Sequence, residues 1–91
     1  MPTLVIKGKI TKGYDHWLAE YDGLEKYREE NYGIKTIYRG QNLKETETIH
    51  IVMFTPTMEA LQKHMENDAE IISKAGGDPN PEASTIAVCS D

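Results

Sequence analysis

Hydrophobic residues along this chain recur with two periods, and the order of those periods predicts strand, helix, strand, strand, helix, strand. Residues 3–10 alternate in the manner of a β-strand, with apolar side chains gathered on one side. Strands are also predicted over 34–40, 48–54 and 84–89. Between the first and second strands, and again between the third and fourth, apolar residues recur at three- and four-residue spacing, which predicts amphipathic helices.

The first helical segment is predicted to be broken. Its apolar pattern begins at Tyr14, and Asp22 with Gly23 interrupts it. Asp22 followed by Glu25 has the spacing of a capping box, so a second helical piece is expected to begin there. Gly33 is expected to end that piece, because glycine tolerates the left-handed backbone found at helix ends.

The second helical segment is predicted as one helix. Either Thr55 or Thr57 is its expected N-cap, and Pro56 suits the first turn if Thr55 is the cap. The helix is expected to end at the glycines 76–77, and a loop with two prolines follows over 78–82. Its apolar stripe consists of Met58, Leu61, Met65, Ala69 and Ile72.

This element order predicts an α+β fold, the ferredoxin-like βαββαβ sandwich, with two helices on one face of a four-stranded antiparallel sheet. The short connection between the second and third strands requires an antiparallel hairpin. The side chains expected under the helices are Leu4, Ile6, Ile10, Ile37, Ile49, Ile51, Met53, Ile86 and Val88. The side chains expected on the open face are Val5, Tyr38, Val52, Phe54 and Ala87, interleaved with Lys7, Lys9, His50 and Thr85.

Length and charge narrow the functional classes. A chain of 91 residues is expected to form a single domain, 1–91, with a small core. Its formal net charge of −5 opposes binding to nucleic acid and to anionic membranes. The single cysteine, Cys89, cannot form an internal disulfide, so a reducing cytoplasm is the expected compartment and an inert buried thiol the expected state. No run approaches the roughly 20 apolar residues of a membrane helix.

The open sheet face predicts a partner. A contiguous apolar face on a small domain marks an interaction surface, and a second copy of the chain would enlarge its core. We therefore expect a homodimer formed sheet to sheet. Lys7 and Lys9 require carboxylate partners or a position at the rim, because an unpaired buried charge is strongly destabilising.

Three segments carry a family resemblance: DHWLAEYD at 15–22, GIKTIYRG at 33–40 and MEALQKHMENDAEIISKAG at 58–76. With the element order, they resemble the dimeric α/β-barrel superfamily and, within it, a small uncharacterised family of short bacterial proteins. The resemblance implies that two sheets pack open face to open face. Superfamily members include cofactor-independent quinone-forming monooxygenases, haem-degrading enzymes, chlorite dismutases, muconolactone isomerases and stress-induced proteins of unknown role, so the resemblance implies a fold more than an activity.

Aromatic residues of the first helix are the main candidates for a ligand site. Tyr14, Trp17 and Tyr21 share one helical face and are expected to line a pocket between that helix and the sheet, where superfamily enzymes hold aromatic substrates. The alternative is that this stripe is simply core. Tyr38 is a further candidate at the end of the second strand, and Arg39 beside it points to the opposite side and discourages further strand pairing.

The three histidines lie on three different predicted elements and lack the close spacing of metal ligands, so no metal site is expected. His16 is expected to face solvent, and His64 to be partly buried and hydrogen-bonded. His50 lies on a central strand among apolar neighbours and needs a polar partner, either across the dimer interface or in a ligand site. His16 or His50 is the expected polar partner of a ligand.

No cofactor is expected. The superfamily oxygenases use Asn, Trp and His around the pocket; Trp17 and a histidine are present, but the asparagines fall at helix ends, in loops or at an outward helical position. His64 is the one conceivable haem ligand, and nothing around it is specific to haem. The asparagines in question are Asn31, Asn42, Asn67 and Asn80.

Four functional hypotheses follow from these observations. The first is a homodimeric small-molecule-binding or accessory protein that binds a small aromatic ligand without catalysis. The second is a cofactor-independent monooxygenase or isomerase acting on a small aromatic or unsaturated substrate. Binding of single-stranded RNA on the open face ranks last, because the aromatic motif of that class is missing and the charge is wrong. A regulatory amino-acid-binding module shares the topology and stays open.

Overall fold

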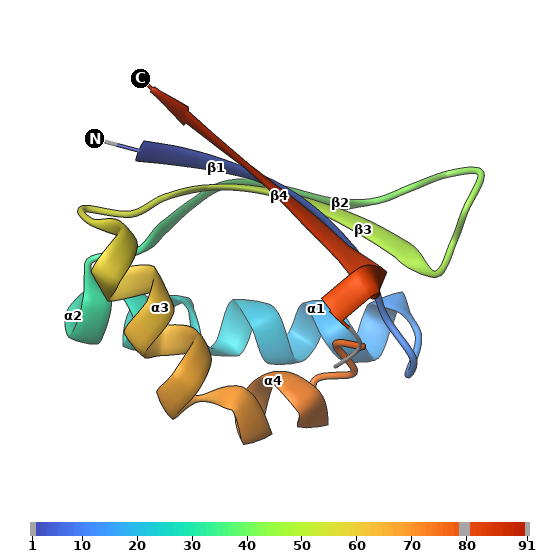
Figure 1. The fold of residues 1–91 in the computed structure, drawn as a ribbon. Coiled ribbons are helices and arrows are strands. Elements are labelled where there is room, and N and C mark those ends of the chain that lie inside the picture. The colour runs from blue at the N-terminus through green and yellow to red at the C-terminus, as the bar shows by residue number, and fades with distance from the viewer. Residues whose placement is uncertain (1, 79–80, 91) are drawn as a thin grey trace.

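The computed structural model describes residues 2–78 and 81–90 of the chain and contains the predicted order of elements (Figure 1). Residues 79–80 of the predicted proline loop lie outside the described residues. The elements are β1 (Pro2–Lys9), α1 (Tyr14–Gly23), α2 (Glu25–Tyr32), β2 (Lys35–Gln41), β3 (Thr48–Phe54), α3 (Met58–Asn67), α4 (Ala69–Lys74), the short 3-10 helix η1 (Pro81–Ala83) and β4 (Ser84–Ser90).

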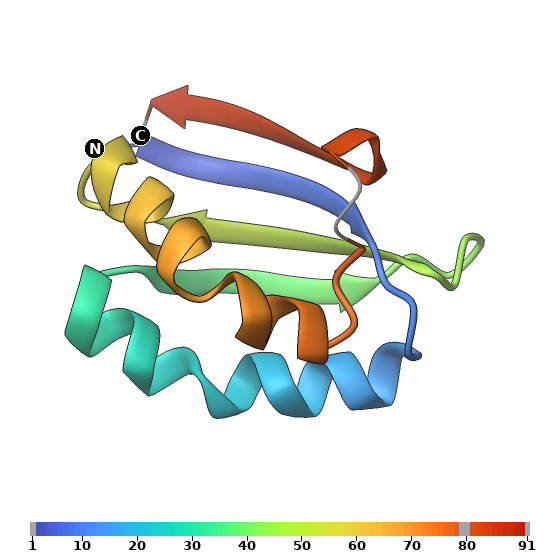
Figure 2. The ribbon, with the colours of Figure 1, turned by 60° about the horizontal axis from the view of Figure 1, so that its bottom comes forward.

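The four strands form one antiparallel sheet in the order β2-β3-β1-β4, and the helices lie together on one of its faces (Figures 1 and 2). This arrangement confirms the ferredoxin-like prediction. The central pair places Leu4 opposite Met53 and Ile6 opposite Ile51, so the apolar positions of β1 and β3 point to the same side. None of the helices in the described part of the chain has the length and hydrophobicity that crossing a bilayer requires.

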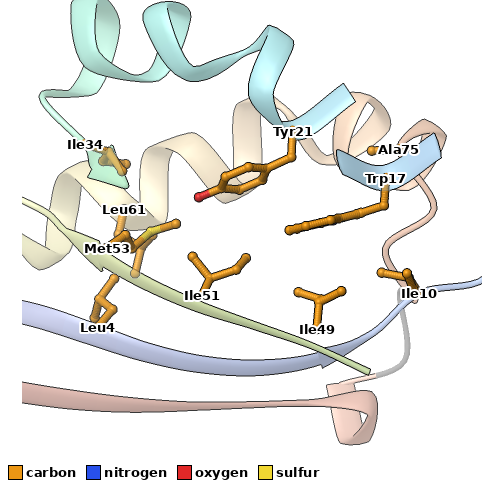
Figure 3. Packing of buried hydrophobic residues seen from close by; sticks show 10 residues of the cluster. All are labelled: Leu4, Ile10, Trp17, Tyr21, Ile34, Ile49, Ile51, Met53, Leu61 and Ala75. Carbon is orange, nitrogen blue, oxygen red and sulfur yellow. The ribbon is translucent and has the colours of Figure 1, made fainter. Parts of the chain in front are cut away.

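The core lies between β1 and β3 on one side and the helices on the other (Figure 3). Trp17 and Tyr21 point from α1 toward Ile49 and Ile51 of β3. Leu4 and Ile34 are fully buried at the other end of the sheet, and burying a side chain of this size contributes roughly 1.5–3 kcal/mol. The ten buried apolar residues are Leu4, Ile10, Trp17, Tyr21, Ile34, Ile49, Ile51, Met53, Leu61 and Ala75.

The predicted break in the first helix is confirmed, but the predicted capping box is wrong. Leu24, with φ −102° and ψ 3°, separates α1 from α2, and no side chain caps the start of α2. The carboxylates of Asp22 and Glu25 bind Arg39 and Thr36 of β2 instead, because the strand offers them charged and backbone donors. Gly33 adopts φ 70° and ends α2 as predicted.

The second helix is not continuous, which corrects the prediction of one helix. Thr57 caps α3 by accepting a hydrogen bond from the amide of Ala60 at 3.0 Å, so Thr55 is not the cap. The helix breaks at Asp68, where α3 ends and α4 begins. Two members of the predicted stripe, Met58 and Met65, are 43% and 46% exposed, since the break and the helix orientation leave them outside the core.

Three of the side chains expected to be buried under the helices are exposed: Ile37, Ile86 and Val88. Ile37 is 63% exposed, because the register between β2 and β3 shifts between Thr36 and Tyr38 and leaves Ile37 as the extra residue of a bulge. Ile86 and Val88 pair with Ile6 and Leu4, as the alternation predicts, but they are 39% and 54% exposed. β4 is an edge strand that the helices do not cover (Figure 2).

The open face carries the apolar residues assigned to it. Val52 lies between Val5 on β1 and Tyr38 on β2, which are 45% and 52% exposed. Ala87 continues this row on β4. Cys89 is a free thiol and is exposed within the single chain. A monomer therefore presents an apolar stripe that runs across all four strands.

Candidate functional site

The three aromatic candidates of α1 form a continuous stack. The rings of Trp17 and Tyr21 lie 4.8 Å apart at an interplanar angle of 23°, and Tyr14 lies 5.9 Å from Trp17 at 29°. Trp17 and Tyr21 are buried, whereas Tyr14 is half-buried at the start of the helix. Helical spacing thus brings these rings together as expected, and their inner edges contribute to the core.

A small cavity of about 50 Å³ lies beside Trp17 and Tyr21, between the pair α1 and α2 and the pair α3 and α4. No strand residue lines it, which differs from the predicted place between the first helix and the sheet. The space toward the sheet is filled by Ile49 and Ile51 (Figure 3). The lining residues are Trp17, Tyr21, Leu24, Tyr27, Arg28, His64, Asp68, Ile71, Ile72 and Ala75.

Arg28 lines this cavity on the side of α2, and its side chain is buried, with 3% of the residue exposed. Its Nη2 donates hydrogen bonds to the carbonyl of Tyr21 and to Oε2 of Glu25, each at 2.7 Å. The guanidinium carbon lies 3.8 Å from the centre of the Tyr21 ring, a cation–π contact. The Nε–H of Arg28 is buried and has no acceptor among the described residues.

Glu25 links Arg28 to the sheet. Its Oε1 accepts from the amide of Thr36 at 2.8 Å, and its Oε2 accepts from the Thr36 hydroxyl at 2.7 Å. Because that hydroxyl has one proton, the Tyr21 hydroxyl donates to Thr36 Oγ1 at 2.6 Å. Burial disfavours ionisation of Glu25, but the bonds from Thr36 and Arg28 outweigh it and lower the pKa of Glu25, while burial raises the pKa of Tyr21.

His64 and Asp68 form a buried pair on the opposite wall. Nδ1 of His64 lies 2.9 Å from Oδ2 of Asp68, and the Tyr27 hydroxyl donates to Oδ1 at 2.9 Å. Burial opposes ionisation of Asp68, yet its hydrogen bonds, led by the one from His64, lower its pKa. The same carboxylate raises the pKa of Tyr27 to about 12. With Asp68 ionised, the proton of a neutral His64 resides on Nδ1.

In that neutral tautomer the other ring nitrogen of His64 is an acceptor. Nε2 has no hydrogen-bond partner within the part of the chain that the structure describes, and the imidazole lines the cavity. The Tyr32 ring packs against it at 5.1 Å. A histidine whose orientation is fixed by a carboxylate has the arrangement of a general base. No cluster of three or more metal-binding side chains occurs among the described residues.

The remaining predicted site residues lie elsewhere. His16 is exposed, and its Nε2 lies 3.0 Å from the carbonyl of Lys74, so it joins α1 to the end of α4. His50 contacts the side-chain amide of Asn42 at 3.1 Å within the same chain. Because His50 faces the same side of the sheet as the exposed Tyr38, the sheet separates both of them from the cavity.

A known protein family matches nearly the whole chain. The model of the family described as Domain of unknown function (DUF3764) matches residues 1–87. The chain belongs to that family. No curated protein matches the sequence of this DUF3764 chain.

Solved structures of similar fold cover the DUF3764 chain completely. One, described as an antibiotic biosynthesis monooxygenase, has a TM-score of 0.65 and 17% identity, with 98% of that chain covered. A structural-genomics protein, YJCS, has a TM-score of 0.69 at 9% identity and 99% coverage. A putative antibiotic biosynthesis monooxygenase from Deinococcus radiodurans has a TM-score of 0.60 at 8% identity and 92% coverage. These likenesses, at 17% identity or less, confirm the predicted fold and show nothing beyond the fold.

A second hollow of this DUF3764 chain lies at the bulged edge of β2 and has a volume of about 300 Å³. Its charged residues satisfy each other: Arg39 donates to both carboxylate oxygens of Asp22, at 2.9 and 2.7 Å. The hydrogen bonds from Arg39 lower the pKa of Asp22. Because the charges of Arg39 and Asp22 offset each other and the hollow lies in the open, the cavity between the helices is the stronger candidate site.

Sequence reasoning named Trp17 and Tyr21 as ligand candidates, for a pocket toward the sheet. It missed Arg28 and Asp68, and it considered His64 as a buried, hydrogen-bonded residue or a haem ligand and not as part of this cavity. The available signal was the four-residue spacing of His64 and Asp68, which puts both on one helix face. Glu25 and Arg28 likewise lie three residues apart on one helix face, but that spacing does not predict burial, since arginine on a helix is usually solvated.

Proposed function

We propose that this chain is a homodimeric small-molecule-binding or accessory protein of the dimeric α/β-barrel type, whose ligand occupies the cavity between the helices. The observation that carries the proposal is the convergence of Arg28, His64 and Asp68 on one cavity beside the Trp17 and Tyr21 rings. Burying such polar groups costs stability, so their placement at one cavity favours a binding role. The aromatic walls favour a small aromatic ligand.

The ligand requires the cavity to widen, since about 50 Å³ holds only a few water molecules and small-molecule pockets span roughly 300–1,000 Å³. The wall that can move is α4, which contributes Ile71 and Ile72 to the cavity and contains no buried residue. Elements with little buried apolar surface open at low cost. Outward displacement of α4 about the break at Asp68 would admit a planar ring beside Trp17.

Fluorescence of Trp17 tests this proposal, because it is the single tryptophan of the chain. Titration with phenols, quinols and small aromatic acids is expected to give a saturable change for at least one compound. His64→Ala should weaken that binding about tenfold, the equivalent of one lost hydrogen bond. The matched control is Lys63→Ala, an exposed neighbour of His64 on α3 that does not line the cavity, and this variant should bind as the wild type does. If no compound changes the emission, the proposed ligand site is wrong.

The proposed homodimer forms through the open sheet face, where Val52 sits between Val5 and Tyr38. Val52→Glu should convert the dimer to a monomer, because it places an unpaired charge in the apolar interface. Val88→Glu is the matched control, since Val88 is exposed on the other side of the sheet and should leave the dimer intact. Sedimentation equilibrium measures both. A wild-type monomer at micromolar concentration would contradict the dimer.

The alternative is an enzyme, a cofactor-independent monooxygenase or isomerase acting on a small aromatic substrate. The carboxylate-oriented imidazole of His64 favours it, and so does the fold shared with a structure described as an antibiotic biosynthesis monooxygenase. Oxygen uptake and isomerisation of bound phenols or quinols would be assayed with the wild type and with His64→Gln. Turnover that His64→Gln abolishes while binding persists would favour the enzyme over the binding protein.

A further inference from the structure

We infer that the ligand of the cavity between the helices is neutral and carries an oxygen acceptor, which receives the hydrogen bond of the Arg28 Nε–H. This inference rests on the proposed function and names the chemistry of its ligand. Among the buried side-chain nitrogen and oxygen atoms of the described residues, the Arg28 Nε is the one without a hydrogen-bond partner. Buried polar groups are almost always paired, so an unpaired donor on a residue that lines a cavity favours an acceptor from outside the chain.

The Arg28 guanidinium is held through Nη2 and through its contact with the Tyr21 ring, and this sets the direction of the unpaired Nε–H. Nη2 is held by the carbonyl of Tyr21 and by Glu25, and the guanidinium lies over the Tyr21 ring. Because the N–H groups of a guanidinium point outward in its own plane, the acceptor must lie at its edge and not over its face. A planar ligand meets this condition when one oxygen projects from its ring toward Arg28.

The charges around the cavity select against an anion. The positive charge of Arg28 is already compensated by Glu25 at 2.7 Å. On the opposite wall Asp68 is held in its ionised form and pairs with His64, and the nearby hydroxyls of Tyr21 and Tyr27 are neutral. In either protonation state of His64, the carboxylates of Glu25 and Asp68 offset every cation that lines the site, so a carboxylate ligand would bring a negative charge without compensation.

Three probes of similar shape separate the possibilities: benzamide offers a neutral carbonyl, benzoate is its anionic counterpart, and toluene has no oxygen. Dissociation constants are measured by Trp17 fluorescence and by calorimetry at neutral pH. We expect benzamide to bind at least about tenfold more tightly than toluene, as for a hydrogen bond from a charged donor, and more tightly than benzoate.

Arg28→Lys tests the donor itself, because lysine keeps a cation for Glu25 but has no N–H at the Nε position. In this variant the preference for benzamide over toluene should fall to less than about threefold. The control is Arg39→Lys, which alters the exposed pair with Asp22 and should keep the wild-type preference. If Arg28→Lys does not fold, the three probes on the wild-type protein decide the question alone.

The outcomes distinguish this inference from the proposal beneath it. Equal affinity for benzamide and toluene means that water satisfies the Nε–H and overturns the inference, while the binding site stands. Tightest binding of benzoate, or a benzamide preference that survives Arg28→Lys, overturns it as well. If none of the three probes binds while a phenol or quinol does, the inference fails and the binding site stands. If none of these compounds binds, the proposed ligand site fails and the inference fails with it.

Discussion

The helices form two arms, α1 with α2 and α3 with α4. Each arm is broken between its two helices, and the polar side chains at the two breaks bind different partners. At the break in the first arm, Asp22 and Glu25 reach across to β2, where they bind Arg39 and Thr36. At the break in the second arm, the carboxylate of Asp68 bonds to side chains of other helical residues and to no strand.

This difference gives the cavity one fixed wall and one weakly held wall. α1 and α2 contribute three buried residues, Trp17, Tyr21 and Arg28, and are tied to the sheet at their junction. α4 contains no buried residue, and its C-terminal end is held by hydrogen bonds from His16 and Lys12 to the carbonyl of Lys74. A break can therefore fix a helix to a sheet or free it to move, depending on where its polar side chains find partners.

The largest expected effect on stability tests whether α4 is packed less firmly than α3. Leu61→Ala in α3 should lower the free energy of unfolding by about 3 kcal/mol, because it leaves a cavity in the core. Ile71→Ala in α4 should cost about 1 kcal/mol, since its side chain is only half-buried. Chemical denaturation measures both variants. Equal losses would show that α4 is anchored as firmly as α3.

The anchoring of the first arm is tested by Arg28→Met. The variant leaves Glu25 without its buried cation and the Tyr21 carbonyl without a donor, so we expect a loss of about 2 kcal/mol, reduced because Glu25 is one-third exposed. Lys26→Met is the control two residues away; its pair with Glu30 is exposed, and its removal should change stability by less than about 0.5 kcal/mol. Similar losses for the two variants would contradict the anchoring role.

The smallest expected effect concerns acid. The pKa of Asp68 is lowered in the folded protein, so its contribution to stability is present above the ordinary carboxyl value near pH 4 and is lost as the pH falls through the lowered value. Asp68→Asn removes this contribution, about 1 kcal/mol, and its unfolding free energy should fall less steeply on acidification than that of the wild type.

Denaturation at about pH 7 and about pH 3 measures this difference. The carboxyl groups of Asp22 and Glu25, whose pKa values are also lowered, keep some acid sensitivity in the variant. Glu20→Gln, an exposed position on α1, should show the wild-type slope. Identical slopes for the wild type and Asp68→Asn would mean that the bond to His64 adds no stability.

Sequence periodicity predicted the buried side chains correctly where the backbone of a strand is regular. On β1 and β3 alternation assigned the buried face correctly, because these central strands pair without irregularity. It failed at Ile37, since a bulge inserts one residue and is invisible in the pattern. It failed at Val88 for another reason: a side chain on the helix side of a sheet is buried only where a helix lies above it.

The candidate site was less predictable than the fold. The stack of Trp17 on Tyr21 follows from helical spacing, so it was within reach. The sequence around the break at Asp68 contains no glycine or proline, the residues that usually indicate the end of a helix. The burial of the pair of Arg28 and Glu25 depends on where α2 meets β2. Contacts of this kind are set by tertiary packing, which a local pattern does not contain.

The central place of β1 in the sheet has a kinetic consequence. Its partners are β3 and β4, and pairs such as Gly8 with Ser84 join residues roughly 80 positions apart, a separation that slows folding. Among the four strands β1 is synthesised first, yet its second neighbour, β4, is synthesised last. Until β4 arrives, one edge of β1 is an unpaired apolar template, and this interval is when the nascent chain is most exposed to aggregation.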